Sequence, residues 1–262
     1  MKIATWNVNG IRARAGQVCE FLEREKPDVL CLQELKANID QVPLECRATD
    51  YHIYWHGSTV RAYSGVSLHL NKMTFPEPPA FTHPDFDMES RIVAGEARGT
   101  VFASVYVPNG GKDYPAKLRF LQQMRDWAHR IHAEGKQLVI CGDINIARTE
   151  RDVHPVERRN VIGQLPEERA LLEDLIGSHM VDVHRKLDPD NERLFTWWAP
   201  WRKMREKNIG WRLDYVLASK PLAEKAQACV VQREFGTSDH GPVVMTLNNS
   251  VPGTQFSPIM RL

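Results

Sequence analysis

Short runs of apolar and β-branched residues recur along the chain, and most are bounded by turn residues. These runs predict eight strands, at 2–8, 29–35, 52–55, 66–71, 101–107, 137–143, 213–218 and 243–247. Three further segments, 18–24, 116–133 and 167–175, predict helices. The second of these carries apolar residues at three- and four-residue steps, the spacing of one helix face. The alternation of strands and helices indicates a mixed α/β chain.

The composition is that of a globular protein, with 262 residues of which 42% are hydrophobic and 26% charged. Proline-rich patches at 76–79 and 155–166 predict loops, and no low-complexity linker divides the chain. We therefore expect a single domain over 1–248. The segment 249–262 has turn chemistry but no periodicity, and we expect a C-terminal tail there.

Several classes of protein are disfavoured by the sequence. No apolar run approaches the roughly 20 residues of a membrane helix, and the start, MKIATWNVNG, lacks the apolar core of a secretory signal. A cytoplasmic protein without membrane association is expected. The five cysteines have neither metal-binding nor disulfide spacing, which predicts reduced thiols. Because the net charge is only +1, any site for a polyanion must be local.

Polar and ionisable residues gather where the apolar runs end. A helix cap or a turn explains any one of them. An unpaired charge beside an apolar run costs free energy, however, so several such residues together indicate a ligand site. The residues of this kind are Asn7, Asn9, Gln33, Glu34, Lys36, Tyr106, Asn109, Asp143, Asn145, Asp214, Asp239 and His240.

The chemical types in this set favour a hard cation. Carboxylate and amide oxygens without clustered cysteine or histidine suit Mg²⁺ or Mn²⁺ better than zinc. Since Mg²⁺ commonly binds one or two carboxylates together with phosphate and water, phosphoryl chemistry is the leading candidate. The chain has no GxxxxGK[ST] loop, no GxGxxG after a strand and no GxSxG elbow, so nucleotide-loop, dinucleotide-binding and serine-hydrolase classes lose support.

Six motifs follow one another over nearly the whole chain: TWNVNGIRA, DVLCLQELK, VYVPNG, CGDINIA, GWRLDYVLAS and SDHGPV. In this order they closely resemble the exonuclease III family of apurinic/apyrimidinic (AP) DNA endonucleases. The resemblance implies a four-layered α/β sandwich, with two central mixed β-sheets flanked by helices and the active site at one end. It also implies a Mg²⁺-dependent hydrolase of base excision repair, for which Mn²⁺ can substitute, acting as a monomer on double-stranded DNA.

The resemblance implies two activities. One is cleavage of the DNA backbone 5′ to abasic sites, and the other is removal of 3′-blocking groups and nucleotides by a 3′→5′ exonuclease. Two departures from the family pattern bear on their balance. Ser90 in MESRIV stands where relatives often have glycine, and RRNVIGQL replaces a NAGF-type loop.

Carried over residue by residue, the resemblance assigns the metal to Glu34, with Asn7 and Asp239 organising the same pocket. His240 is expected to contact the scissile phosphate or the attacking water, and Asp214 to orient its ring. A histidine beside an aspartate has a set tautomer and a raised pKa, which suits contact with an anionic phosphate.

The other catalytic assignments also come from the resemblance. Asp143 is expected to align or deprotonate the nucleophilic water, while Asn145 and Asn109 hold phosphate oxygens. Tyr106 is expected to donate toward the phosphate or the leaving group. Hydrolysis of an anionic diester requires such a set, because it needs a positioned base, a cation and fixed hydrogen-bond donors.

The segment FTWWAPWRKMREKNIGWRLDY combines four of the seven tryptophans with five basic and two acidic residues. This mixture suits DNA, because the charges contact phosphates while apolar groups stack or wedge into a groove. For Trp197 and Trp198, a buried strand at 195–198 explains the pattern equally well. The resemblance implies a minor-groove wedge at 202–204 and a wall of the abasic-sugar pocket at Trp211. The predicted DNA-binding residues are Arg202, Lys203, Met204, Trp211, Trp201, Lys112 and Arg12.

Two alternatives stay open on the sequence alone. The first is a related phosphodiesterase or phosphatase that acts on RNA or phospholipid headgroups, against which the wedge-like loop and the GWRLDY context favour DNA. The second is a catalytically silent nucleic-acid-binding protein. This second alternative is disfavoured, because it gives the reactive residues no role.

Overall fold

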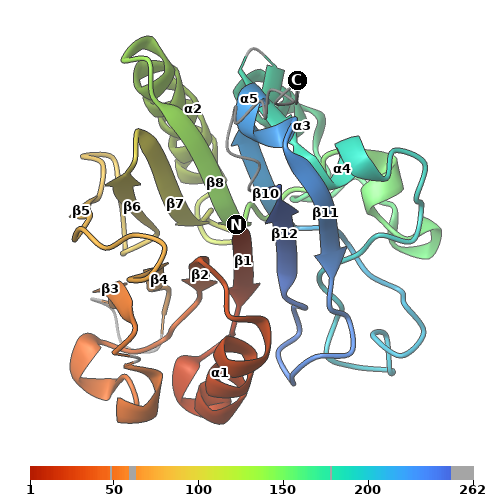
Figure 1. The fold of residues 1–262 in the computed structure, drawn as a ribbon. Helices are drawn as coiled ribbons and strands as arrows, with labels where there is room; N and C mark the ends of the chain where they lie inside the picture. The colour runs from red at the N-terminus through yellow and green to blue at the C-terminus, as the bar shows by residue number, and fades with distance from the viewer. Residues whose placement is uncertain (48, 59–62, 178, 249–262) are drawn as a thin grey trace, which may run out of the picture.

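The computed structural model describes residues 1–47, 49–58, 63–177 and 179–248. The described residues form two six-stranded sheets (Figure 1). The tail expected over 249–262 lies outside the described residues, so the domain boundary at 248 stays a prediction.

Each sheet joins segments from distant parts of the chain. The order of the first sheet is β11 (Ala226–Val231), β12 (Val243–Leu247), β1 (Lys2–Asn7), β2 (Val29–Gln33), β4 (Val66–Asn71) and β3 (Tyr51–His56). The order of the second is β5 (Ala80–Thr82), β6 (Ile92–Ala97), β7 (Thr100–Tyr106), β8 (Gln137–Asp143), β10 (Asp214–Ser219) and β9 (Met180–Asp182).

Both sheets are mixed. β1 pairs with β2 in parallel across a connection through α1 (Ile11–Glu25), and β7 pairs with β8 in parallel across α2 (Tyr114–Ala133). A parallel pair needs such a crossover, whereas the other pairings are antiparallel and need only short connections. The remaining helices are α3 (Pro166–Gly177), α4 (Val183–Leu187) and α5 (Lys220–Ala223), with single 3₁₀ turns at Ile39–Gln41, Leu44–Cys46, Glu150–Asp152 and Pro155–Glu157.

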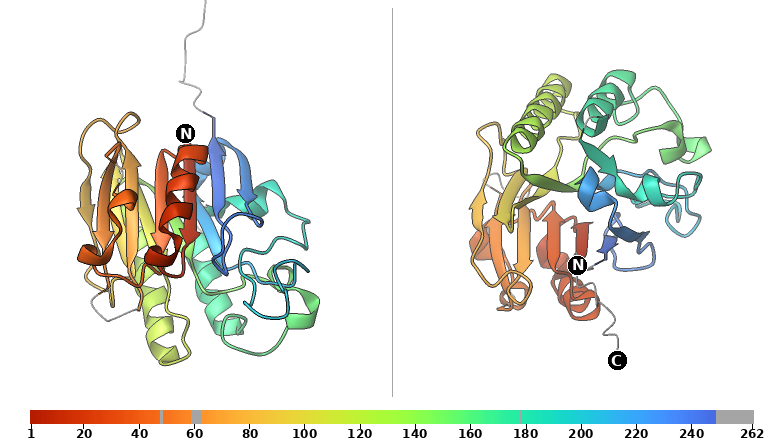
Figure 2. Two further views of the ribbon diagram at one scale, coloured as in Figure 1. Left: turned by 90° about the horizontal axis from the view of Figure 1, so that it is seen from below. Right: turned by 45° about the horizontal axis from the view of Figure 1, so that its top comes forward.

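The elements form four layers, with α1 outside the first sheet and α2 and α3 outside the second (Figure 2). Three buried apolar clusters hold the layers together. One joins α2 and α3 to the second sheet, one lies between the two sheets, and one joins α1 to the first sheet. The four-layered α/β sandwich expected from the sequence is confirmed.

All eight predicted strands are present, each within two residues of its predicted ends. The sequence missed β5, β6, β9 and β11. β5 and β9 have three residues each, β6 carries Gly95 in its middle, and β11 is an edge strand whose residues are mostly part-exposed, so none shows a clear apolar run.

The predicted start of one helix was wrong, and the strand considered for 195–198 is absent. α1 begins at Ile11, seven residues before the predicted start, because its first turns are polar and contain Gly16, although Ile11 and Ala15 are buried at helical spacing. The segment 195–198 forms no strand. Trp197 instead makes isolated bridges to Trp211 and His240, while Trp198 is buried.

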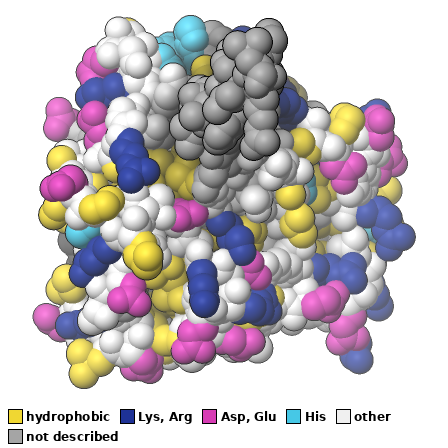
Figure 3. All heavy atoms as spheres, in the orientation of Figure 1, with side chains coloured by type: hydrophobic (Ala, Val, Ile, Leu, Met, Phe, Trp, Pro, Cys, Tyr) yellow, Lys and Arg dark blue, Asp and Glu magenta, His cyan; other side chains and the backbone are white. Residues whose placement is uncertain are grey.

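The state of the cysteines and the distribution of surface charge agree with the composition. All five cysteines are free thiols, and four of them are buried. Across the described ranges, no helix has both the length and the apolar character that a membrane span requires. On the face shown in Figure 3, basic and acidic side chains are interspersed, as a net charge of +1 suggests.

Candidate active site

The register of the second sheet brings three predicted catalytic residues into one row. Tyr106 of β7 is the cross-strand partner of Asp143 of β8, which is in turn the partner of Asp214 of β10. Cross-strand partners present their side chains on the same face of a sheet. From the facing sheet, the Asn7 amide Nδ2 donates to Asp143 Oδ2 at 2.9 Å. The site therefore lies where the ends of the two sheets meet.

Asp143 is held by hydrogen bonds on both of its oxygens. Besides the bond from Asn7, the backbone N–H of Asn145 donates to Oδ1 at 2.9 Å, and the Asn145 side chain donates to Oδ2 at 3.3 Å. The preceding Gly142 is required by the close approach of the neighbouring strand. A Cβ at this position would lie only 1.9 Å from the Val105 carbonyl oxygen. The backbone thus fixes where the carboxylate points.

His240 lies between two carboxylates. Its Nδ1 lies 2.8 Å from Asp214 Oδ2, and its Nε2 lies 3.8 Å from Asp143 Oδ2. Burial by itself lowers the pKa of His240, but the charges of Asp214 and Asp143 outweigh it and raise the pKa to about 10. The ring is therefore an imidazolium at neutral pH.

Burial raises the pKa of two other groups in the row. Burial is the main cause at Asp143, where the charge of Asp214 adds to it and His240 opposes it. Burial also raises the pKa of Tyr106 well above 10, with further contributions from Glu34 and Asp143. Tyr106 is therefore a protonated hydrogen-bond donor, and Asp143 is a more basic carboxylate than usual.

A cavity of about 330 Å³ opens at this row. Its polar wall includes most of the predicted catalytic and metal residues, and its apolar wall includes Trp211. Gly163 permits this wall, because a Cβ there would lie 2.9 Å from the Trp211 ring. The residues that line the cavity are Glu34, Tyr106, Asn109, Gly111, Asp143, Asn145, Ile162, Gly163, Trp197, Trp211, Leu213, Asp239 and His240.

The three residues predicted for the metal pocket differ in the contacts that they already make. Glu34 directly follows β2 with a left-handed φ of 57°, lines the cavity and forms an ion pair with Lys36 at 3.0 Å. Both oxygens of Asp239 already accept hydrogen bonds, from Asn9 at 2.7 Å and from the Trp197 indole at 3.0 Å. Asn7 is fully buried and donates to Asp143, and it does not line the cavity.

The donor set fits a divalent cation. Two carboxylates, Glu34 and Asp143, line the same cavity, and the charge of Glu34 adds to the raised pKa of Asp143. Asp214 Oδ1 is buried and accepts no hydrogen bond within the described part of the chain. A buried carboxylate oxygen without a partner is costly, and a cation offsets that cost.

The predicted DNA-binding loop lies beside the cavity. Trp201 is exposed, as are Arg202 and Lys203, both of which have left-handed backbone. A second hollow is lined by Lys203 and Met204 together with Asp239, which also lines the first cavity. Two of the predicted wedge residues, Lys203 and Met204, therefore lie near the cavity. Lys112 lies over the Tyr63 ring at 4.6 Å, and Arg12 is exposed on the first turn of α1.

The comparisons with known proteins agree with this geometry. A model of the Endonuclease/Exonuclease/phosphatase family matches residues 4–240. The chain belongs to this family. It is 30% identical to a Bacillus subtilis exodeoxyribonuclease over 95% of its own length and all of that protein.

Solved structures of family members superpose closely. An AP endonuclease from Archaeoglobus fulgidus has a TM-score of 0.83 and 28% identity, covering 95% of this chain and 99% of its own. A Neisseria 3′ phosphatase bound to a product DNA hairpin has a TM-score of 0.83 and 27% identity, with 95% of this chain covered. The resemblance to exonuclease III-type AP endonucleases is confirmed.

The sequence analysis missed some buried residues that support this site. Lys117 of α2 is fully buried, donates to the Asn145 carbonyl oxygen at 2.8 Å and pairs with buried Glu168 of α3 at 2.5 Å. Glu168 also accepts from the backbone N–H groups of Gly163 and Leu165. One ion pair thus supports both Asn145 and the cavity loop. The helical pattern of α2 gave no sign that this lysine faces inward.

Arg205 was also missed. Its guanidinium donates to the carbonyl oxygens of 233, 235, 236 and 238 and lies over the Trp198 ring at 5.1 Å. It therefore fastens the predicted DNA-binding loop to the segment that ends in Asp239 and His240. The sequence showed it only as one of five basic residues in the loop.

Proposed function

We propose that this protein is a metal-dependent DNA repair phosphodiesterase that cleaves the backbone 5′ to abasic sites and removes 3′-blocking groups. The arrangement of Asp143 and His240 carries this proposal, because it combines a basic carboxylate with an imidazolium in the lining of one cavity. The activities for which the relatives are named, an exodeoxyribonuclease, an AP endonuclease and a 3′ phosphatase, support the same chemistry.

Asp143 and His240 divide the two tasks of hydrolysis. Asp143, with a raised pKa, accepts the proton of the attacking water or aligns that water against phosphorus. His240 presents its protonated Nε2 to the cavity and offsets the negative charge of the phosphate. Asp214 keeps the ring charged and holds its orientation from behind.

Three further side chains hold the phosphate and the leaving group. Asn145 donates to the Val107 carbonyl oxygen and to Asp143, so its position is fixed beside the phosphate site. Asn109 lines the same cavity, with its Oδ1 accepting from Gly111 N–H and its Nδ2 available to a phosphate oxygen. Tyr106 donates toward the leaving oxygen, because its hydroxyl keeps its proton.

Mg²⁺, with Mn²⁺ as a substitute, is the ion we assign to this site. Glu34 is the proposed principal ligand, and Asn7 and Asp239 organise the pocket around it. The ion supplies charge stabilisation for the phosphate. An oxygen-rich donor set suits a hard cation.

Double-stranded DNA is the proposed partner, bound by a monomer. Trp211 leaves its indole N–H buried without a hydrogen-bond partner among the described residues, which suits a ligand in the cavity. The apolar wall of Trp211 and Ile162 suits a deoxyribose without its base. The loop with Arg202 and Lys203 contacts the phosphates on the rim. The cytoplasmic location expected from the sequence stays a prediction.

One assay tests reaction class and specificity together. Three duplexes carry an internal abasic site, a 3′-phosphate or an unmodified 3′ end, and each is incubated with Mg²⁺ or with EDTA. We expect Mg²⁺-dependent cleavage 5′ to the abasic site and release of the 3′-phosphate. Absence of cleavage on all three, with turnover of RNA or a phospholipid headgroup, would replace the proposal with the related-phosphodiesterase alternative. DNA binding without any cleavage would support a silent binding protein.

A further inference from the structure

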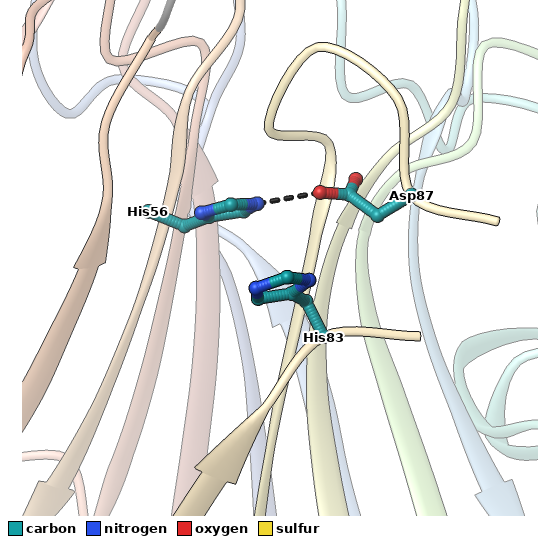
Figure 4. Close-up of side chains that lie close together, drawn as sticks. All are labelled: His56, His83 and Asp87. Carbon is teal, nitrogen blue, oxygen red and sulfur yellow. Dashed lines mark hydrogen bonds and ion pairs between the residues drawn. The ribbon is translucent and has the colours of Figure 1, made fainter. Parts of the chain in front are cut away.

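We propose that His56, His83 and Asp87 form a second metal site, separate from the nuclease cavity, for a zinc-class divalent ion (Figure 4). His56 ends β3, His83 directly follows β5, and Asp87 lies in the loop between β5 and β6. One ligand atom from each residue lies within 4.8 Å of the other two. Bonds of about 2.0 Å in a tetrahedral site place ligand atoms about 3.3 Å apart, so rotations of these side chains can close the set.

The donor types differ from those of the nuclease cavity. Two imidazoles and one carboxylate are a nitrogen-rich set, which suits zinc and related transition metals better than Mg²⁺. His83 is exposed, while the other two side chains are partly buried. The exposed side leaves a fourth position for water, as in three-ligand zinc sites.

Asp87 is oriented before any ion binds. Its Oδ1 accepts hydrogen bonds from the backbone N–H groups of Arg91 at 2.8 Å and Ile92 at 3.0 Å. Only Oδ2 remains, and it faces His56 Nε2 at 2.5 Å. Partners of this kind fix the direction of a metal-binding carboxylate. A bound ion takes the place of the proton between Asp87 and His56.

An ion pair between His56 and Asp87 alone does not explain the position of the His83 ring. Its ring stacks on His56 with centroids 4.8 Å apart and an interplanar angle of 10°, and Figure 4 shows both rings beside the carboxylate. A histidine binds a metal through a ring nitrogen, and each of these two rings offers one such atom beside the Asp87 carboxylate.

The site joins the open edges of the two sheets. β3 is the edge strand of the first sheet and β5 is the edge strand of the second, and the rings of Tyr54 and Phe81 pack between them at 5.6 Å. An ion shared by His56 and His83 cross-links these edges. Through Asp87 it also anchors the loop that carries Arg91, whose guanidinium lies 4.8 Å over the Tyr106 ring. The role of the ion is to stabilise this edge and the adjacent loop.

Zinc titration of the full chain tests this site without any measurement of DNA cleavage, so its result is independent of the proposed nuclease function. The chelator-stripped protein is titrated with Zn²⁺ in excess Mg²⁺, and its melting temperature is measured with and without Zn²⁺. His83→Ala is the test variant, since this exposed side chain is not needed for folding. His129→Ala, which removes an exposed histidine from α2, is the matched control.

We expect the wild type and His129→Ala to bind one more equivalent of Zn²⁺ than His83→Ala, and only those two to gain melting temperature from that equivalent. Co²⁺ in place of Zn²⁺ should give the intense visible bands of tetrahedral coordination in the same two proteins. Equal stoichiometry in the wild type and His83→Ala would overturn the proposal. So would loss of the extra equivalent in His129→Ala, or a weak octahedral cobalt spectrum in the wild type.

Discussion

His240 Nδ1 and Asp214 Oδ2 lie 2.8 Å apart in a bond that is almost fully buried, with side-chain exposures of 5% and 0%. The bond leaves His240 Nε2 as the atom directed toward Asp143 and the cavity. Asp214 thus controls both the orientation and the charge of the ring. Its removal should change the pH dependence of cleavage as well as its rate.

Asp214→Asn should shift the alkaline limb of the pH–rate profile to lower pH. The pKa of His240 is raised to about 10 in the folded protein, so the imidazolium is present below that pH and lost above it. Without the Asp214 charge the pKa falls toward the ordinary value of about 6.5, so activity is lost at lower pH. The measurement is the cleavage rate of abasic duplex at saturating Mg²⁺ between pH 6 and pH 10.

Asp190→Asn is the control for the pH experiment, because this aspartate is 92% exposed. Its profile should match that of the wild type. An alkaline limb in Asp214→Asn that coincides with the wild type would show that Asp214 does not hold the proton on His240.

Asp143→Asn and His240→Ala should each slow abasic-site cleavage by at least ~100-fold, because each removes a group proposed to act on the proton or the phosphate. DNA binding should survive in both. In Asp143→Asn it should even tighten, since a negative charge beside the phosphate is removed. Single-turnover cleavage and a separate binding assay in EDTA distinguish the two effects. Near-normal turnover in either variant contradicts the role given to that residue.

The exposed loop should contribute to DNA binding through charge. Replacing Arg202 or Lys203 by Gln should reduce the slope of log Kd against log salt concentration by about 1 for each phosphate that the side chain neutralises. Lys220→Gln is the matched control, because Lys220 follows the far end of β10 from Asp214. Identical slopes in the wild type and all three variants would remove this loop from the DNA-binding surface.

Much of the site was predictable because it follows strand ends. Asp143, Asp214 and Tyr106 each end or begin an apolar run that the sequence marks clearly, and the sheet register then brings them together. The pairing of distant strands could not be derived from the runs themselves. The resemblance placed Asn7 in the metal pocket with Glu34, and its contact with Asp143 was seen only in the structure.

Residues that act through buried contacts were harder to find. Lys117 and Glu168 look like surface charges of amphipathic helices, and nothing local in the sequence shows that both are buried. The cluster of His56, His83 and Asp87 joins two edges that the strand pattern could not place side by side, because β5 was not recognised. Predictions from local patterns fail where a contact depends on tertiary placement.

Arg212 lies in the chain between the cavity residues Trp211 and Leu213. Its ion pairs should make the free energy of unfolding fall at acidic pH. Its buried guanidinium binds Asp182 through two bonds of 2.9 and 2.7 Å and Asp152 through one of 2.7 Å. Burial would raise the pKa values of both carboxyl groups, but Arg212 outweighs it and holds them below their usual range. Their contribution is therefore present above pH ~3.9 and is lost as the pH falls through the lowered values.

Asp152→Asn should lower the free energy of unfolding at pH 7 by about 3–5 kcal/mol, because it leaves a buried charge without one partner. The difference from the wild type should shrink as the pH falls below about 4, where the carboxyl group of Asp152 takes up a proton in the unfolded wild type but not yet in the folded one. Urea unfolding at pH 7 and pH 3 measures both values, with Asp190→Asn as an exposed control that leaves stability unchanged. A difference that stays constant between these pH values would mean that Asp152 stabilises the cavity wall by packing and not by its charge.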